Sequence, residues 1–129
     1  MMPTFLWKAA AIALAIACEI HPLNNLRVLN YLIGTLGVAR EQKDGWYKYW
    51  VDVGFEALEK KLAQERETGV FCHGNEPTLA DVCLVPQLAN ARRFGVDLAA
   101  YPRLLKAEAA AKQLKAFADA APDKQPDAE

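Results

Sequence analysis

Five polar residues interrupt segments that are otherwise apolar, and their types suit the binding of a small anion. His21, Asn24 and Asn25 are spaced i, i+3 and i+4, so in a helix they share one face. Arg27 lies near the edge of that face, and Arg93 stands at the end of a later helical pattern. Guanidinium groups pair with carboxylates through two parallel hydrogen bonds, so two arginines beside amide donors favour a small dicarboxylate ligand.

The same residues also have a structural explanation. Pro22 interrupts the helical pattern and frees the backbone carbonyl of Cys18, because proline has no N–H. His21 and the two asparagines would then cap the resulting kink, while the two arginines would be ordinary surface charges. Composition alone favours this explanation over a binding site.

The residues from 74 to 95 predict the central helix of the domain and explain how it begins and ends. Thr78 is the expected N-cap, and Asp81 three residues later forms a capping box with it. Beyond the cap the segment is almost wholly apolar, which is typical of a helix in the middle of a domain. Pro86 predicts a kink within the helix, and Gly95 is placed to end it. Loss of the Thr78 cap should cost about 1 kcal/mol.

Periodicity predicts further helices on either side of this segment. One long helix is expected over 7–34 with an interruption at Pro22, and a second over 39–66. We expect the second helix to contact another helix closely at Gly54. After Pro102 the pattern predicts two short helices that meet near Lys112. The residues expected on the buried side of the second helix are Trp46, Trp50, Val53, Ala57, Leu58 and Leu62.

Composition limits the class of protein. The chain has 129 residues, of which 53% are hydrophobic and 24% charged, with a net charge of −1. This length supports one domain with its own core, and the near absence of alternating apolar residues predicts an all-α fold. The charge balance gives no indication of nucleic-acid binding. The apolar run 9–17 is too short to span a membrane. The one basic residue near it, Lys8, lies inside the helical segment and does not lead it, so we expect neither a membrane segment nor a signal peptide.

The three cysteines, Cys18, Cys72 and Cys83, predict neither disulfides nor a metal site. An odd number without a C-x-x-C spacing is typical of a reduced, cytoplasmic protein. Cys72 is followed by His73, but no second ligand pair occurs at the spacing that a metal needs, so we expect no metal. Cys18 falls on an apolar helix face, where a thiol is unreactive.

Two longer segments, ACEIHPLNNLRVL (17–29) and FCHGNEPTLADVCLVPQLANARRFGVDLAAYP (71–102), closely resemble zeta-class glutathione transferases, in particular the bacterial maleylacetoacetate and maleylpyruvate isomerases. The T-L-A-D helix start is shared by many glutathione transferases. The combination of H-P-L-N-N-L-R with V-P-Q-x-x-N-A-R-R-F is specific to a much smaller group of them. The resemblance covers residues 8–127 and lies in that family's C-terminal, all-helical domain. It implies a glutathione-transferase-type bundle of about five helices over residues 7–121, with a leader at 1–6 that matches nothing and a polar tail at 122–129.

The resemblance also implies roles for the five polar residues. The position of His21 and the segment from Asn24 through Asn25 to Arg27 help line the family's cleft for glutathione and substrate. The position of Arg93 is associated with binding the carboxylate of the substrate. The family's catalytic groups lie in an N-terminal thioredoxin-fold domain with a Ser-Ser-Cys type motif, for which this chain shows no pattern, so we expect no catalytic residue here.

The function implied is that of the helical substrate-binding domain of a glutathione-dependent cis–trans isomerase of maleyl-type dioic acids. The complete protein would be a cytoplasmic homodimer, and this chain alone would be inactive. We expect an exposed apolar patch where the thioredoxin-fold domain would dock. The alternatives left open are a non-catalytic module that binds other proteins and a domain that serves only for dimerisation.

Overall fold

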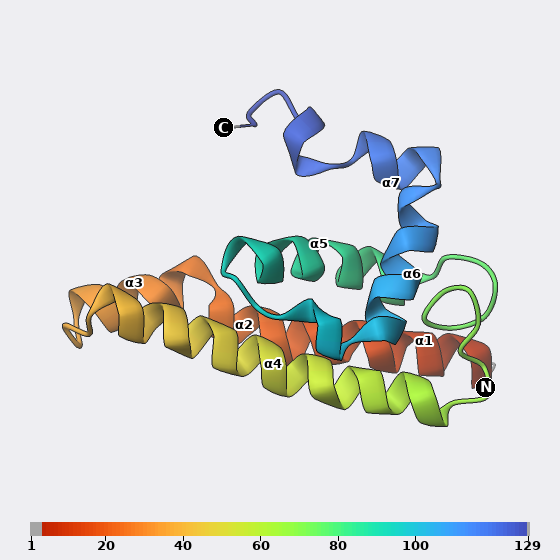
Figure 1. The fold of residues 1–129 in the computed structure, drawn as a ribbon, viewed down its shortest axis with the longest axis horizontal. Helices are drawn as coiled ribbons and strands as arrows, with labels where there is room; N and C mark the ends of the chain where they lie inside the picture. Colours follow the sequence, from red (N-terminus) through yellow and green to blue (C-terminus); the bar gives the residue numbers. More distant parts are fainter. Residues whose placement is uncertain (1–3, 129) are drawn as a thin grey trace.

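Helices joined by short loops make up the part of the chain that the computed structural model describes, residues 4–128 (Figure 1). The all-α prediction is confirmed, since about 73% of the described residues are helical and they contain no strand. The elements are α1 (Thr4–Leu14), a π-helical segment (Ala15–Ile20), α2 (His21–Asn24), α3 (Leu26–Gly34), α4 (Arg40–Gln64), α5 (Leu79–Arg93), a 3₁₀ turn (Leu98–Ala100), α6 (Pro102–Lys112), α7 (Lys115–Asp119) and a 3₁₀ turn (Pro122–Lys124).

The first helical stretch is not the single helix expected over 7–34. The N–H of His21 donates to the carbonyl of Ile16, five residues earlier, so a π-helical turn precedes Pro22. Asn25 has an extended backbone with ψ 145°, and this ends α2 before α3 begins. Proline and a π-turn are two of the usual causes of a break in a long helix. The predicted interruption near Pro22 therefore occurs, but it divides the stretch into separate helices.

The leader expected at 1–6 lies only partly within the described residues. Residues 1–3 are outside them, whereas the backbone from Thr4 onward already belongs to α1. The Phe5 ring contacts the His73 ring edge-on, with 4.6 Å between their centroids. The beginning of α1 is thus packed against the loop that leads to α5.

The stretch Phe5–Gly34 is long and apolar enough, by length and composition, to cross a membrane. Its inward side, however, forms part of the core. Ile12, Ile16 and Ile20 are each only 1% exposed and belong to one apolar cluster with residues of α4, α5 and α6. A core helix passes the same test of length and composition, so the test is weak evidence for a membrane segment here.

Helix α4 confirms the predicted second long helix, but its buried face differs from the predicted one. Val53 is 43% exposed and Ala57 is also exposed, so both were assigned to the wrong side. The face is set where Gly54 meets Ile20 of the π-helical segment, since a Cβ at Gly54 would overlap the Ile20 side chain. The close contact expected at Gly54 is therefore confirmed. The buried residues of α4 are Tyr47, Val51, Phe55, Leu58 and Leu62.

Helix α5 packs against α1 and α6, with α4 on the opposite side of α1 in Figure 1. The capping box at Thr78 and Asp81 is present. The helix continues through Pro86 to Arg93 and ends in a Schellman motif. In this motif Gly95 has φ +71°, and the N–H of Val96 donates to the carbonyl of Ala91. The predicted start and end of the central helix are both confirmed.

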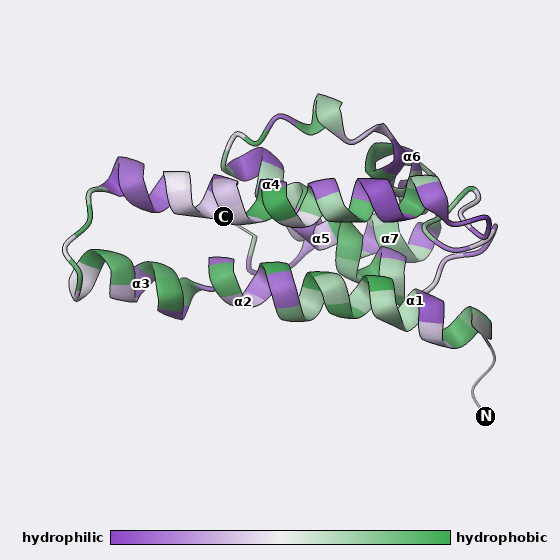
Figure 2. Cartoon of the chain, turned by 90° about the horizontal axis from the view of Figure 1, so that it is seen from below, coloured by the Kyte–Doolittle hydropathy of each residue, from purple (hydrophilic) through white to green (hydrophobic). Residues whose placement is uncertain are grey.

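The last helices depart from the rest of the bundle. As predicted, the chain forms two short helices on either side of Lys112, α6 and α7. Figure 1 shows α7 and the C-terminal residues extending away from α6 on the side of α5. The hydropathy colouring in Figure 2 shows apolar residues along much of α1 and α3. The position of α7 leaves apolar side chains of α5 beside a hollow that α7 also lines.

Candidate functional site

The break between α2 and α3 places several polar side chains opposite α5. Pro22 is in the first turn of α2, directly after the π-helical segment, and has no N–H to donate. Trp46 of α4 donates from Nε1 to the carbonyl of Leu23 at 2.7 Å. This hydrogen bond attaches α2 to α4, so the side chains of α2 are held in a fixed position relative to the bundle.

His21 and Asn24 meet a glutamine of α5. The Nδ2 of Asn24 donates to Oε1 of Gln87 at 3.1 Å, and Nε2 of Gln87 lies 3.3 Å from Nδ1 of His21. Asn24 is 6% exposed and Gln87 is 4% exposed, whereas His21 is open to solvent. Two of the five predicted site residues are thus brought together, in a polar network with one solvent-facing member.

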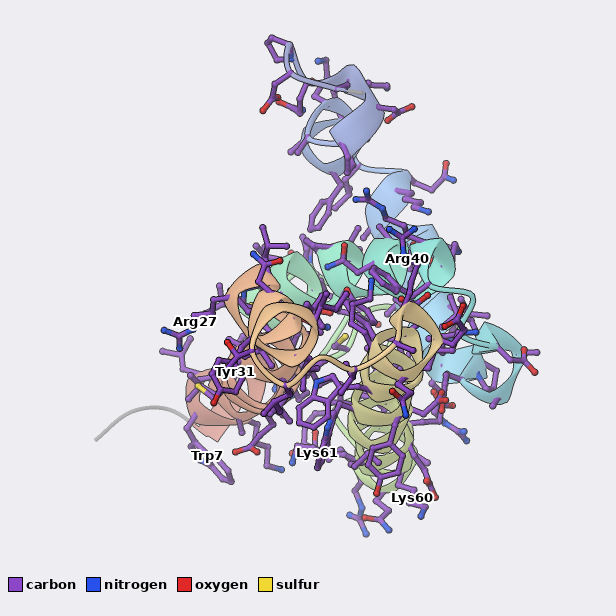
Figure 3. All side chains as sticks on the ribbon, turned by 90° about the vertical axis from the view of Figure 1, so that its left-hand side faces the viewer. Trp7, Arg27, Tyr31, Arg40, Lys60 and Lys61 are labelled. Atoms are coloured by element: carbon purple, nitrogen blue, oxygen red, sulfur yellow. The ribbon has the colours of Figure 1, made fainter. Side chains whose placement is uncertain are left out.

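Asn25 and Arg27 have different surroundings. The Oδ1 of Asn25 accepts a hydrogen bond from the N–H of Arg27 at 3.1 Å, so Asn25 is the N-cap of α3. The side chain of Arg27 is exposed and points away from the bundle in Figure 3. The capping explanation therefore applies to Asn25, and a role of Arg27 in binding stays a prediction.

Arg93 lies at the C-terminal end of α5 and lines a hollow of about 640 Å³. The other residues that line it belong to the C-terminal segment and include Asp123, Gln125 and Asp127. Burial raises the pKa of the Tyr47 hydroxyl, and the positive charge of Arg93 acts in the opposite direction. Arg27 is not among the residues that line this hollow.

The neighbouring Arg92 has a structural partner. Its guanidinium makes a two-pronged ion pair with Glu108 of α6, and Lys112 also pairs with Glu108 at 2.9 Å. Burial alone would raise the pKa of Glu108, but the hydrogen bonds from Arg92 and Lys112 outweigh it and lower that pKa. Arg92 therefore ties α5 to α6, and its guanidinium is already engaged in that pair.

A second hollow, of about 670 Å³, lies between α5 and α7. Most of its lining is apolar, and Glu108 and Lys112 are the charged residues that α6 contributes. Val82 on its α5 side is 53% exposed. The apolar residues of α5 in this hollow are Val82, Val85, Pro86 and Ala89, and those of α7 include Ala116 and Phe117.

Cys72 and Cys18 have different surroundings. Burial raises the pKa of Cys72, and the nearby Asp81 carboxylate raises it further. His73 is fully buried beside Cys72, and no group of three potential metal ligands occurs within residues 4–128. Cys18 is solvent-exposed, although the sequence had placed it on an apolar helix face.

Gln87 is the member of the network that the sequence analysis did not select. It stands in the V-P-Q run among apolar residues, and a buried amide in such a run needs partners. This polar residue among apolar ones was the feature of the sequence that could have identified Gln87 as part of a buried network. The imidazole of His21 faces solvent beside this network, whereas Arg93 lies at a separate hollow at the end of α5. Both side chains can donate hydrogen bonds, which suits an anionic ligand.

The profile of the family described as glutathione S-transferase, C-terminal domain, matches residues 51–120. The chain therefore belongs to the glutathione S-transferase C-terminal domain family. Within this family, its relatives include a probable maleylacetoacetate isomerase of Vibrio cholerae, which is 52% identical over 122 residues that cover 95% of this chain and 56% of the relative.

Solved structures agree with this placement. A holo maleylpyruvate isomerase described as a bacterial zeta-class glutathione S-transferase superposes with a TM-score of 0.92 at 43% identity, covering 95% of this chain and 58% of that one. A maleylacetoacetate isomerase from Methylobacterium extorquens with bound malonate and glutathione gives a TM-score of 0.95 at 33% identity, covering 100% and 60%. The chain thus spans a little over half the length of the relatives it matches.

Proposed function

We propose that this chain is the helical substrate-binding domain of a glutathione-dependent cis–trans isomerase of maleyl-type dicarboxylic acids. The observation that carries the proposal is the 52% identity to a probable maleylacetoacetate isomerase across 95% of the chain. The donors that face solvent near α2 and at the end of α5 are of the right kind for carboxylates. The relative that binds malonate and glutathione together supports the same class of ligands.

In this proposal each polar residue has a defined task. Arg93 pairs with one carboxylate of the substrate, and Arg27 contributes a second positive charge near the N-terminus of α3. His21 supplies a hydrogen bond in the cleft in which glutathione and substrate lie side by side, and Asn24 supports it through Gln87. The amide nitrogen of Asn25, whose Oδ1 caps α3, supplies another. Imidazole and amide groups fit glutathione, since that tripeptide offers carboxylates and peptide carbonyls as acceptors.

Bound glutathione would supply a thiolate that adds reversibly to the double bond of the acid and so permits rotation. The residues of this chain would bind the carboxylates of the substrate and exclude water from the cleft. Holding one end of the substrate in place lowers the entropic cost of bringing its double bond to the thiolate and leaves the other end free to rotate. No residue of this chain is assigned to proton transfer or nucleophilic attack.

The complete enzyme would pair this domain with a thioredoxin-fold domain and would form a cytoplasmic homodimer. The apolar hollow between α5 and α7 is a suitable docking surface for the thioredoxin-fold domain, because such interfaces bury apolar side chains. Exposed aromatic and aliphatic residues such as Tyr49 and Val53 of α4 are available for a contact between two copies.

A chimera tests the proposal directly. The matched 56% of the Vibrio cholerae relative is replaced by this chain, and glutathione-dependent isomerisation of maleylacetoacetate is followed by absorbance. We expect the chimera to be active and this chain alone to be inactive. Arg93→Leu in the chimera should raise KM roughly 10- to 100-fold, since a hydrogen bond to a charged group contributes about 1.5–3 kcal/mol.

Arg66→Leu is the matched control, because Arg66 is an exposed arginine in the turn after α4 and should leave KM unchanged. A chimera that folds and binds glutathione but does not turn over the substrate would contradict the proposed activity. Turnover by this chain alone would contradict the assignment of all catalytic groups to another domain. Capture of a stable protein partner without any dependence on glutathione would favour the interaction module instead.

A further inference from the structure

The amide of Gln87 links two residues of α2 and makes opposite kinds of hydrogen bond with them. Its Oε1 accepts from Nδ2 of Asn24 at 3.1 Å, so its Nε2 is the atom that faces Nδ1 of His21 at 3.3 Å. An amide nitrogen can only donate a hydrogen bond. The Nδ1 atom of His21 must therefore act as the acceptor and carry no proton.

This requirement decides where the proton of His21 lies. A neutral imidazole carries a single N–H, so an unprotonated Nδ1 leaves that proton on Nε2. The side chain of His21 is exposed, and Nε2 is the ring nitrogen that Gln87 does not contact. His21 then offers a neutral N–H donor at the surface of the network, and it has no free basic nitrogen there.

Burial makes the orientation of the Gln87 amide costly to reverse. Gln87 is 4% exposed and Asn24 is 6% exposed, so water cannot readily replace either hydrogen bond. A buried polar group left without a partner is costly, because it has given up its hydrogen bonds to water without a replacement. The hydrogen bond from Trp46 to the carbonyl of Leu23 holds α2 in place, so Asn24 cannot easily move away from Gln87.

We infer that Gln87 is a positioning residue that fixes His21 in the tautomer protonated on Nε2. This inference rests on the proposed function for its purpose, because a neutral N–H donor is what a carboxylate or a carbonyl oxygen of the bound ligand would accept. It also limits the role of His21 to donation, since the solvent-facing nitrogen already holds the proton. Asn24 acts through Gln87 and sets the direction of its amide.

The tautomer can be measured on this chain alone by nitrogen NMR. The sequence contains only two histidines, His21 and His73, so a sample labelled with ¹⁵N-histidine gives two ring systems. The variant His21→Gln assigns them, and His73 serves as the internal control. At alkaline pH, where imidazole is neutral, we expect a protonated Nε2 and a bare Nδ1 for His21, with separate and unaveraged shifts.

Two isosteric variants should move the proton. In Gln87→Glu the introduced carboxylate accepts from both neighbours, so Nδ1 of His21 should become protonated. In Asn24→Asp the introduced carboxylate cannot donate, so Gln87 should turn its NH₂ toward it and present Oε1 to His21, which again protonates Nδ1. The double variant Asn24→Asp with Gln87→Leu should lose the protonation of Nδ1, because leucine makes no hydrogen bond to His21. Its His21 nitrogen shifts should then be averages over the two tautomers. The shifts of His73 should stay unchanged in every variant.

The inference would be overturned if His21 of the unmodified chain were protonated on Nδ1. It would also be overturned if neither isosteric variant changed the His21 tautomer. Circular dichroism verifies that each variant folds. If the variant with Gln87→Leu does not fold, the two isosteric variants alone still test the tautomer. These readouts are independent of activity. If the tautomer responds as expected while Gln87→Glu leaves KM of the chimera unchanged, the positioning of His21 holds, and the proposed contact between His21 and the ligand is the part that fails.

Discussion

Asp81 shows how one buried side chain can organise the start of a helix and the loop before it. Its carboxylate is fully buried, and Oδ2 accepts from the N–H of Thr78 at 2.9 Å while Oδ1 accepts from the N–H of Cys72 at 3.1 Å. The first bond belongs to the capping box that the sequence predicts. The second connects positions nine residues apart and holds the loop against the helix.

Replacing Asp81 with alanine should therefore cost more than the loss of an ordinary cap. We expect Asp81→Ala to lower the free energy of unfolding by about 3 kcal/mol, because two backbone N–H groups lose their acceptor in a buried place. Urea denaturation measures this change. Asp97→Ala is the control, since Asp97 is an exposed N-cap that accepts from the N–H of Ala99, and its loss should cost about 1 kcal/mol. Equal losses in the two variants would show that the bond to Cys72 contributes little.

At the scale of helices, the contact between α4 and the π-helical segment depends on the absence of a side chain. Gly54 lies against Ile20, which is only 1% exposed and has no open space to move into. The π-helical turn brings Ile20 toward α4 just before the Pro22 break, so the same irregularity that shapes the site also creates this contact. Close packing here fixes the position of α2 relative to α4.

Two glycines of α4 provide a matched test of this contact. Gly54→Ala should destabilise the chain by about 1–2 kcal/mol, because overpacking of a filled core outweighs the gain in helix propensity. Gly45→Ala should stabilise it by about 0.5–1 kcal/mol, since a Cβ at Gly45 meets nothing within 4 Å. Both changes can be followed by thermal or urea unfolding. Stabilisation by both substitutions would mean that α4 and the π-helical segment are not closely packed.

At the scale of the whole molecule, the apolar surface between α5 and α7 is the largest departure from the expected burial of a central helix. Val82 lines this surface and is 53% exposed, although α5 carries few polar residues on any side. An amphipathic pattern would have signalled a solvent-facing side, and this helix has none. The missing polar face is consistent with a surface that another domain or copy covers, as the sequence led us to expect.

This surface should bind a hydrophobic dye. Val82→Ser combined with Phe117→Ser should reduce the fluorescence of bound anilinonaphthalene sulfonate by about half or more, because both side chains line the hollow of about 670 Å³. The matched control is Val53→Ser on α4, which removes an apolar group of similar exposure that does not line the hollow. An equal decrease in the control, or no dye binding by the unmodified chain, would contradict an exposed apolar surface at this place.

The sequence by itself determined the features that depend on neighbours a few positions apart. Thr78 and Asp81 predict the start of α5, and Gly95 predicts its end, because caps are made within one turn of the helix. The all-α class followed in the same way from periodicity. The roles of the five polar residues rest on the family resemblance and stay predictions. The spacing of His21 and Asn24 was sufficient to place both near one helix break.

Only the tertiary structure decided which distant residues became partners. Gln87 lies 63 positions from Asn24 and 66 from His21, and nothing local to either segment indicates that their helices meet there. The buried face of α4 was likewise set by the fit of Gly54 against Ile20, so periodicity placed Val53 on the wrong side. Helix packing depends on the shapes of both surfaces at once, whereas a sequence pattern describes one surface at a time.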